Sequence, residues 1–187
     1  MYSPSDFRKG LKIEFKGEPY SIVDYQHVKP GKGGAFIRTK IKNMITGRVL
    51  DETFRNQDKL GRPDLEQKNM QYLYRDQDGY CFMDNETYEQ VILTEDQIKD
   101  YLGYLHENLT VNVVYFNGKP VGLELPTTVN LTVLETEPNV KGDTASGGSK
   151  PAKMETGLVV QVPFFIAEGD RLKIDTRSGE YLERVKD

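Results

Sequence analysis

The feature that most constrains this chain is a series of short apolar segments with a period of two, each ended by a turn signal. Apolar and charged residues alternate over residues 11–15, and Lys16-Gly17-Glu18-Pro19 then turns the chain into a second apolar run at residues 20–23. Alternation over about four to eight residues is typical of half-buried β-strands. The first residues therefore predict an antiparallel hairpin.

Two further hairpins follow the same rule. Residues 70–75 and 80–83 flank an Asp-Gly turn, and residues 110–116 and 121–125 flank Asn117-Gly118. Such dipeptides close tight hairpins because both residues tolerate a positive φ. After residue 128 the apolar residues alternate again, and short strands are expected at residues 157–162, 172–174 and 181–185.

Only one segment has the signals of a helix. Thr94 and Gln97 have the spacing of a capping box, and Ile98, Leu102 and Leu105 follow at helical spacing. Because strands greatly outnumber this helix, we expect an all-β chain of small barrels rather than a parallel sheet alternating with helices. Gly and Pro punctuation predicts three domains, at residues 1–63, 64–126 and 127–187.

Charge is distributed unevenly over these three domains. The chain has 25 Lys and Arg against 29 Asp and Glu, but residues 1–63 carry 13 basic and 7 acidic side chains, whereas residues 64–126 carry 4 and 12. No acid lies between Asp24 and Asp51, and this stretch holds six cations: Lys29, Lys32, Arg38, Lys40, Lys42 and Arg48. A basic run allows an acidic protein to bind phosphates. The alternative is an ordinary solvated strand face.

Several function classes are poorly supported. Cys81 is the only cysteine and there are two histidines, so the sequence has no CxxC motif or Cys/His metal cluster, and we expect no metal or cofactor. No stretch approaches the ~20 apolar residues of a membrane span, and no signal peptide is recognisable. We expect a cytoplasmic monomer without a membrane partner. Acidic pairs such as Asp76 and Asp78 leave a hydrolase as an alternative, but no apolar setting raises their pKa, so no catalytic residue is expected.

The sharpest local feature is a glycine-rich segment between two expected strands. Pro30 restricts the backbone, and the glycines around Lys32 leave its amine as the one reaching group at a hairpin tip. The segment consists of Lys29, Pro30, Gly31, Lys32, Gly33 and Gly34. The motifs of nucleotide-hydrolysing loops are absent. The alternative is a flexible turn without a partner.

A second segment without periodicity covers residues 141–152 and is expected to be a loop. Its hydroxyls and backbone amides suit sugars, phosphates or base edges. The side chains that it offers are those of Asp143, Thr144, Ser146 and Ser149. The alternative is a surface loop that binds nothing.

Taken together, three segments resemble the bacterial elongation factor P family. They are SDFRKGLKIEFKGEPYSIVDYQHVKPGKGGAF at residues 5–36, KGDTASGGSKPA at residues 141–152 and GLVVQVPFFIAEGDRLKIDTRSGEYLERV at residues 157–185. The resemblance implies a KOW/SH3-like barrel followed by two OB-fold barrels, in an elongated arrangement like a tRNA in outline. It also implies a translation factor that is not an enzyme.

The resemblance further implies the partners. Such a factor is expected to enter the 70S ribosome between the P and E sites, to contact rRNA, and to order the P-site peptidyl-tRNA when consecutive prolines stall synthesis. Lys32 matches the tip lysine that many members modify and that reaches along the CCA end. The C-terminal contacts with tRNA and the small subunit are matched by Tyr181 and Arg184. The segment that faces the E-site mRNA codon is matched by Gly142, Asp143, Thr144, Ala145, Ser146, Gly147 and Gly148.

Some questions stay open. Family branches differ around the position of Gly34, so the sequence does not decide whether a lysine-modifying enzyme adds β-lysine, aminopentanol or nothing to Lys32. A lysine rather than an arginine at this position excludes the rhamnosylated branch. A free-standing single-stranded RNA-binding protein is a further alternative, but the acidic middle domain argues against the cationic groove that it would need.

Overall fold

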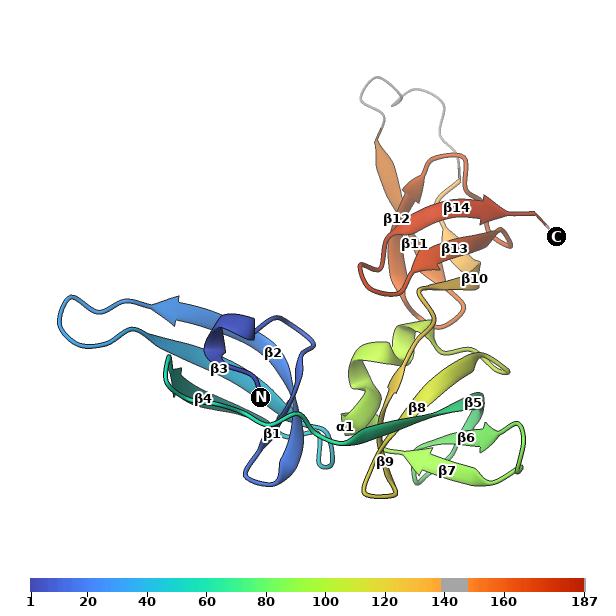
Figure 1. Ribbon diagram of the computed structural model, residues 1–187. Coiled ribbons are helices and arrows are strands. Elements are labelled where there is room, and N and C mark those ends of the chain that lie inside the picture. Colours follow the sequence, from blue (N-terminus) through green and yellow to red (C-terminus); the bar gives the residue numbers. More distant parts are fainter. Residues whose placement is uncertain (139–147, 187) are drawn as a thin grey trace.

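The computed structural model describes residues 1–138 and 148–186, and its regular secondary structure is mainly three antiparallel sheets. Figure 1 shows them as an L, with the first sheet on one arm, the second at the corner and the third on the other arm. The expectation of an all-β chain is confirmed. We propose that each sheet is one domain, divided after residues 63 and 126. Within the described residues, no helix combines the length and apolarity needed to cross a membrane.

The first sheet carries the basic run. Its order is β1-β2-β3-β4, and its strands are β1 (Lys12–Phe15), β2 (Glu18–Val28), β3 (Phe36–Asn43) and β4 (Val49–Arg55), preceded by the 3₁₀ turn η1 (Pro4–Asp6). The predicted first hairpin is confirmed by the pairing of Ile13 with Tyr20. On β3, Ile37, Thr39 and Ile41 are buried. The charged residues between them, Arg38 and Lys40, face solvent, because successive side chains of a strand point to opposite faces.

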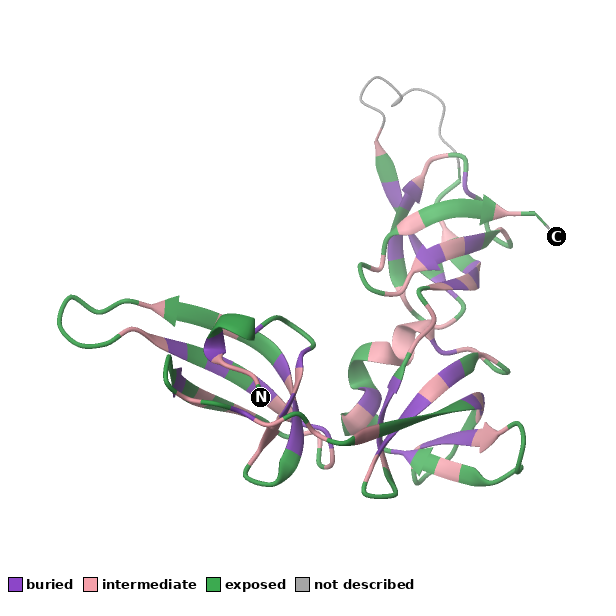
Figure 2. Cartoon of the chain, in the orientation of Figure 1, coloured by how far each residue is buried: buried purple, intermediate pink, exposed green. Residues whose placement is uncertain are grey.

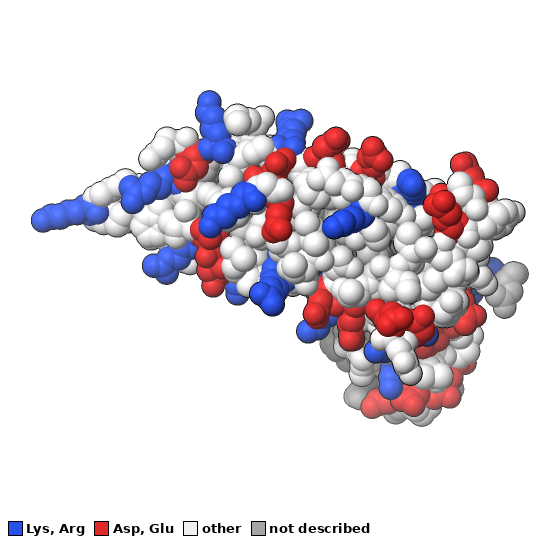
Figure 3. All heavy atoms as spheres, turned by 90° about the horizontal axis from the view of Figure 1, so that it is seen from below, with Lys and Arg blue, Asp and Glu red and all other residues white. Residues whose placement is uncertain are grey.

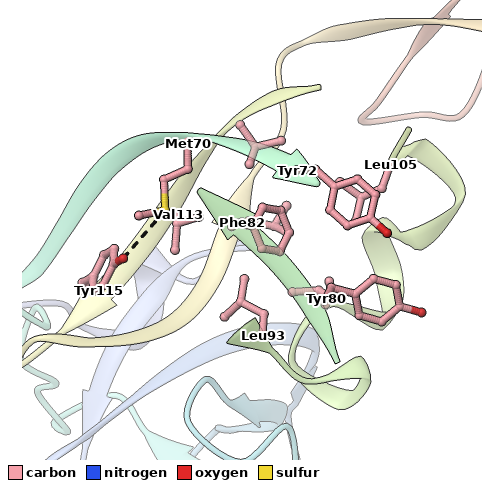
Figure 4. Close-up of a cluster of buried hydrophobic side chains, with 11 residues drawn as sticks. Met70, Tyr72, Tyr80, Phe82, Leu93, Leu105, Val113 and Tyr115 are labelled. Atoms are coloured by element: carbon pink, nitrogen blue, oxygen red, sulfur yellow. Dashed lines mark hydrogen bonds between the residues drawn. The ribbon is translucent and has the colours of Figure 1, made fainter. Parts of the chain in front are cut away.

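The second sheet has the order β7-β6-β5-β8-β9. Its strands are β5 (Leu65–Arg75), β6 (Tyr80–Asp84), β7 (Gln90–Leu93), β8 (Thr110–Phe116) and β9 (Lys119–Glu124). Phe82 is fully buried among Met70, Tyr72, Tyr80 and Leu93 (Figure 4). The Tyr115 hydroxyl donates to Met70 Sδ at 3.7 Å. Both predicted hairpins are present.

The third sheet corrects one expectation. Its order is β12-β11-β10-β13-β14, with β10 (Thr128–Thr136), β11 (Ser149–Met154), β12 (Val159–Pro163), β13 (Arg171–Asp175) and β14 (Tyr181–Val185). The sequence predicts a loop as far as residue 152, but residues 149–152 begin β11. Lys150, Ala152 and Met154 are buried in alternation, a pattern hidden because one of the three is charged and another is small. Pro151 is in register with Gln161 of β12, but its carbonyl faces β10 and accepts from Thr136. Because the ladder with β10 stops at Ala152, the missing N–H on that side interrupts no ladder bond.

The helical segment is also shorter than predicted. The α-helix α1 covers only Glu95–Ile98, and the 3₁₀ helix η2 (Lys99–Tyr104) continues it. The capping box itself is confirmed: Thr94 Oγ1 accepts from the Gln97 N–H at 3.3 Å, and Gln97 Oε1 accepts from the Thr94 N–H at 2.9 Å. A 3₁₀ continuation is common where a short helix connects other elements. Residues 94–104 are called the joint segment below.

One six-residue turn recurs in all three sheets, at residues 43–48, 84–89 and 175–180. In each, the N–H of the fifth residue donates to the carbonyl of the first, at 2.8, 2.9 and 2.8 Å. The side-chain oxygen of the first residue accepts the N–H of the third, at 2.8, 2.8 and 2.7 Å. The fifth residue has a positive φ in each turn: Gly47 at 78°, Tyr88 at 63° and Gly179 at 75°. The middle turn therefore places a tyrosine where the backbone favours glycine.

Candidate functional site

The glycine-rich tip joins β2 and β3 at the end of a long hairpin. The two strands stay paired out to Val28 and Phe36, and the connection projects beyond the rest of the first domain (Figure 1). Residues 29–34 are all exposed, which Figure 2 shows as an unbroken exposed loop. The structure thus places Lys32 where the sequence predicts it, in solvent at the far end of an arm.

The glycines of the tip divide into two kinds. Gly33 has φ 106°, a backbone conformation that disfavours any residue with a Cβ. Gly31 and Gly34 have no such constraint, and a Cβ added at either would meet nothing within 4 Å. The fold therefore does not require glycine at these two positions. Their small size leaves the backbone open to close approach from outside.

The basic face behind the tip is less positive than the sequence suggests. Strand register places Asp24 of β2 and Asp51 of β4 on either side of Lys40. These are the two acids that bound the acid-free run, and the fold brings both onto the same face. Arg38, one step closer to the tip, lies instead between the neutral residues Gln26 and Thr53. A shallow pocket of about 460 Å³ opens over this part of the sheet.

Lys42, also on β3, is mostly shielded from solvent, with 17% of its side chain exposed. It lines a cavity of about 240 Å³ between the first and second sheets, and its Nζ lies 3.9 Å from Asp100 Oδ2. Lys12 lines this cavity too and donates to Ser21 Oγ at 3.1 Å. Burial lowers the pKa of Lys12, and the positive charge of Lys42 adds to this effect while Glu124 opposes it. Of the other cations in the run, Lys29, Lys32 and Arg38 are exposed toward the tip, whereas Arg48 is exposed in the turn at the opposite end of β3.

One face of the molecule shows how the charges are distributed. Figure 3 shows that Lys and Arg gather on the arm that carries the hairpin, whereas Asp and Glu predominate at the opposite end of that view. The exposed cations Lys29, Lys32 and Arg38 give the end of the hairpin a local positive charge, which is the electrostatic feature that phosphate groups require.

The side of the hairpin also presents rings. Tyr25 and His27 of β2 meet edge to face, with ring centroids 5.8 Å apart. On β3 the Arg38 guanidinium lies 5.8 Å from the centre of the Phe36 ring. Aromatic rings and guanidinium planes are surfaces on which nucleic-acid bases stack.

The C-terminal candidates lie on β14 of the third sheet, far from the tip (Figure 1). Tyr181 packs against the buried hydrophobic cluster of the third sheet. The Arg184 guanidinium lies 5.4 Å from the centre of the Phe165 ring and 3.9 Å from Asp170 Oδ2. Phe165 is 53% exposed and was not singled out in the sequence. An aromatic residue in the short turn between two strands was the available signal.

The remaining candidates are only partly placed. Residues 142–147 lie outside the described residues, and Gly148 directly precedes β11. At the base of this segment, the buried Lys150 amine donates to the Glu137 carbonyl, and Thr136 Oγ1 donates to the Pro151 carbonyl at 3.0 Å. Across residues 1–138 and 148–186, no cluster of three or more His, Cys, Asp or Glu side chains is arranged to hold a metal ion.

Comparison with protein families matches the chain in three consecutive parts. The KOW-like domain of elongation factor P matches residues 3–60, its OB domain matches residues 65–123 and its C-terminal domain matches residues 129–184. The chain belongs to the elongation factor P family. A member of this family is a translation elongation factor rather than an enzyme.

Full-length relatives agree with this assignment. Elongation factor P of Nitratidesulfovibrio vulgaris is 58% identical over 184 residues, covering 98% of this chain and 100% of that protein. The elongation factor P of Thermodesulfovibrio yellowstonii is 56% identical over 187 residues, covering 100% of both. Among solved structures, eukaryotic translation initiation factor 5A from Methanococcus jannaschii matches 67% of this chain and 90% of its own, with 22% identity and a TM-score of 0.47. That likeness is too distant to carry an argument.

Proposed function

We propose that this elongation factor binds the 70S ribosome between the P and E sites and places Lys32 beside the CCA end of the P-site peptidyl-tRNA. The observation that carries the proposal is the tip itself: an exposed lysine at the end of a long hairpin, in a segment where the fold does not require the glycine at residue 31 or at residue 34. An amine in this setting can approach a phosphate or ribose closely because no neighbouring side chain obstructs it.

The chemistry needed is positioning. A stall at consecutive prolines arises because the proline nitrogen is part of a rigid ring and reacts slowly. Holding the acceptor end in a geometry suited to attack lowers the entropic part of the activation barrier. Such positioning can lower a barrier by up to about 7–11 kcal/mol. Lys32 supplies a positive charge and hydrogen-bond donors for this purpose and transfers no proton. No metal, cofactor or catalytic residue takes part.

The other candidate contacts extend the same interface. Tyr181 and Arg184 on the third domain are proposed to contact tRNA and the small subunit, and residues 142–148 to face the E-site mRNA codon. Because the tip and β14 lie on different arms of the L, they fit two separated parts of one large partner (Figure 1). A lysine-modifying enzyme is proposed as a further partner, since a modification would lengthen the reach of Lys32.

The test compares Lys32→Ala with Lys59→Ala in a host that modifies the native factor. Lys59 is an exposed lysine outside the tip and serves as the matched control. The readout is synthesis of a reporter containing Pro-Pro-Pro, normalised to the same reporter without prolines. We expect Lys32→Ala to lose the stimulation and Lys59→Ala to keep it. Stimulation by Lys32→Ala equal to that of the wild type would refute the role of the tip.

A further inference from the structure

The joint segment, residues 94–104 of the middle domain, touches both neighbouring domains. Figure 1 shows it at the corner of the L, between the first and third sheets. Its first turn faces the first domain and its last turn faces the third. Eleven residues therefore contribute to both internal contacts of the molecule.

Gln97 forms the contact with the first domain. Its Oε1 closes the capping box, which leaves the amide nitrogen free to donate elsewhere. Nε2 lies 3.0 Å from the Ile45 carbonyl and 3.4 Å from those of Met44 and Pro120. The two ends of this side chain thus have different tasks: the oxygen starts the helix and the nitrogen holds the first domain to the second.

The recurring turn supplies the contact surface on both sides. A Cβ on Gly47 of the first domain would lie 2.7 Å from Asp96 Cβ and 2.8 Å from its carbonyl oxygen. A Cβ on Gly179, at the equivalent position of the third domain, would lie 3.0 Å from the Tyr104 hydroxyl. The same turn therefore presses its glycine against opposite ends of the joint segment. The third copy, with Tyr88, stays exposed.

Further contacts support each side. Between the first and middle domains, Met44, Val114 and Val121 form a small buried cluster. Toward the third domain, the Thr156 hydroxyl donates to the Gly103 carbonyl at 2.6 Å, and a Cβ on Gly103 would lie 3.1 Å from Leu158 Cδ1. These contacts are close enough for a small change in the joint segment to move a whole domain.

We propose that the joint segment sets the position of the Lys32 hairpin relative to the third domain, and that Gln97 is a positioning residue for Lys32. The inference rests on the proposed function, which gives the tip and the third domain separate places on one partner. Strand β3 has eight residues, so the arm measures about 26 Å at ~3.3 Å per residue. A rotation of about 10° at the joint would therefore displace the tip by about 4–5 Å, whereas a misplacement of ~1 Å can cost up to 10²-fold in rate.

The test separates the two ends of the Gln97 side chain. Gln97→Glu keeps an oxygen for the Thr94 N–H and removes the donor to the Ile45 carbonyl; Gln97→Met removes both without adding charge. Gln161→Glu is the matched control, because Gln161 Oε1 accepts from the Ser149 hydroxyl and a carboxylate can do the same. Spin labels at Asn56→Cys and Glu168→Cys, both exposed positions, report the distance between the outer domains. The native Cys81 is buried and does not compete for label.

We expect one narrow distance distribution for the wild type and for Gln161→Glu, and a shifted or broadened one for both Gln97 variants. Translation through consecutive prolines, measured at saturating factor below the melting temperature, should fall at least about tenfold in the Gln97 variants. Under these conditions enough folded factor is present to saturate the ribosomes. A variant whose only defect is lower stability would therefore translate at the wild-type rate. If the Gln97 variants kept the wild-type distances, or showed shifted distances with a normal rate, this inference would be overturned. The proposed function would be unaffected. A fully active Lys32→Ala variant would refute the proposed function and this inference with it.

Discussion

The recurring turn predicts that residue 88 prefers glycine to alanine. Two copies of the turn carry glycine at their fifth position, and the third carries Tyr88 at φ 63° with 71% of its surface exposed. Replacing Tyr88 by Gly or by Ala removes the same exposed ring. The two variants then differ in little except the ability of the backbone to adopt a left-handed conformation.

The magnitude follows from two opposing terms. A left-handed backbone costs a residue with a Cβ about 1–2 kcal/mol, from which glycine is exempt. Glycine in turn loses more backbone entropy on folding, by about 0.5–1 kcal/mol relative to alanine. Tyr88→Gly should therefore be more stable than Tyr88→Ala by about 0.5–1 kcal/mol. Gly47→Ala adds a clash with the Asp96 backbone and should destabilise the protein by about 2–4 kcal/mol in total.

Urea denaturation monitored by far-ultraviolet circular dichroism measures these differences in the free energy of unfolding. Calorimetry measures thermal unfolding of the same variants. The two variants at residue 88 must be compared with each other, since each also loses the contacts of the tyrosine. Calorimetry identifies which transition moves, because three domains need not unfold together. An alanine variant at residue 88 as stable as the glycine variant, with equal slopes in urea, would show that the turn imposes no preference at this position.

The tip and one turn aspartate give further predictions. Gly31→Ala and Gly34→Ala should change the free energy of unfolding by less than about 0.5 kcal/mol, because the added methyl groups meet nothing within 4 Å. Both variants should nevertheless stimulate the Pro-Pro-Pro reporter less than the wild type does. A large loss of stability would contradict the open geometry of the tip. Asp175→Asn tests pH dependence. The backbone N–H groups of Arg177 and Ser178 hold the pKa of Asp175 below its ordinary value of 3.8. The contribution of Asp175 to folding stability is therefore present above pH 3.8 and is lost as the pH falls through the lowered pKa. The melting temperature of the wild type should exceed that of Asp175→Asn at pH 6, and the difference should shrink toward pH 3; a constant difference would contradict this account.

The sequence predicts the fold wherever the local pattern and the burial agree. The hairpin at Asn117-Gly118 and the alternation on β3 are of this kind, because one dipeptide or one face determines the structure. Strand β11 was missed because burial of the long Lys150 side chain depends on the Glu137 carbonyl, a partner 13 residues away. The shortened helix has a similar cause: its last turn is packed against Leu158 of another domain.

The candidate site was predictable in its position but not in its electrostatics. Exposure of Lys32 follows from the local glycines alone. Pairing of Lys40 with Asp24 and Asp51 depends on strand register, which brings together residues that the linear charge count separates. The double use of Gln97 could not be inferred either, because a capping box explains the residue fully until the neighbouring domain is placed beside it.

The bonds at the base of residues 139–147 have a consequence for how such proteins diverge. Two side-chain bonds, Lys150 to Glu137 and Thr136 to Pro151, join the end of β10 and the residue after it to the first residues of β11. The length of a connection between ends fixed in this way affects stability weakly, by about 0.6 kcal/mol for each doubling. Insertions and exchanges of sequence between these two strands should therefore accumulate at little cost to the barrel. The third domain can thus serve as a stable scaffold on which this segment is replaced as a unit, with its two side-chain bonds as the fixed attachment points.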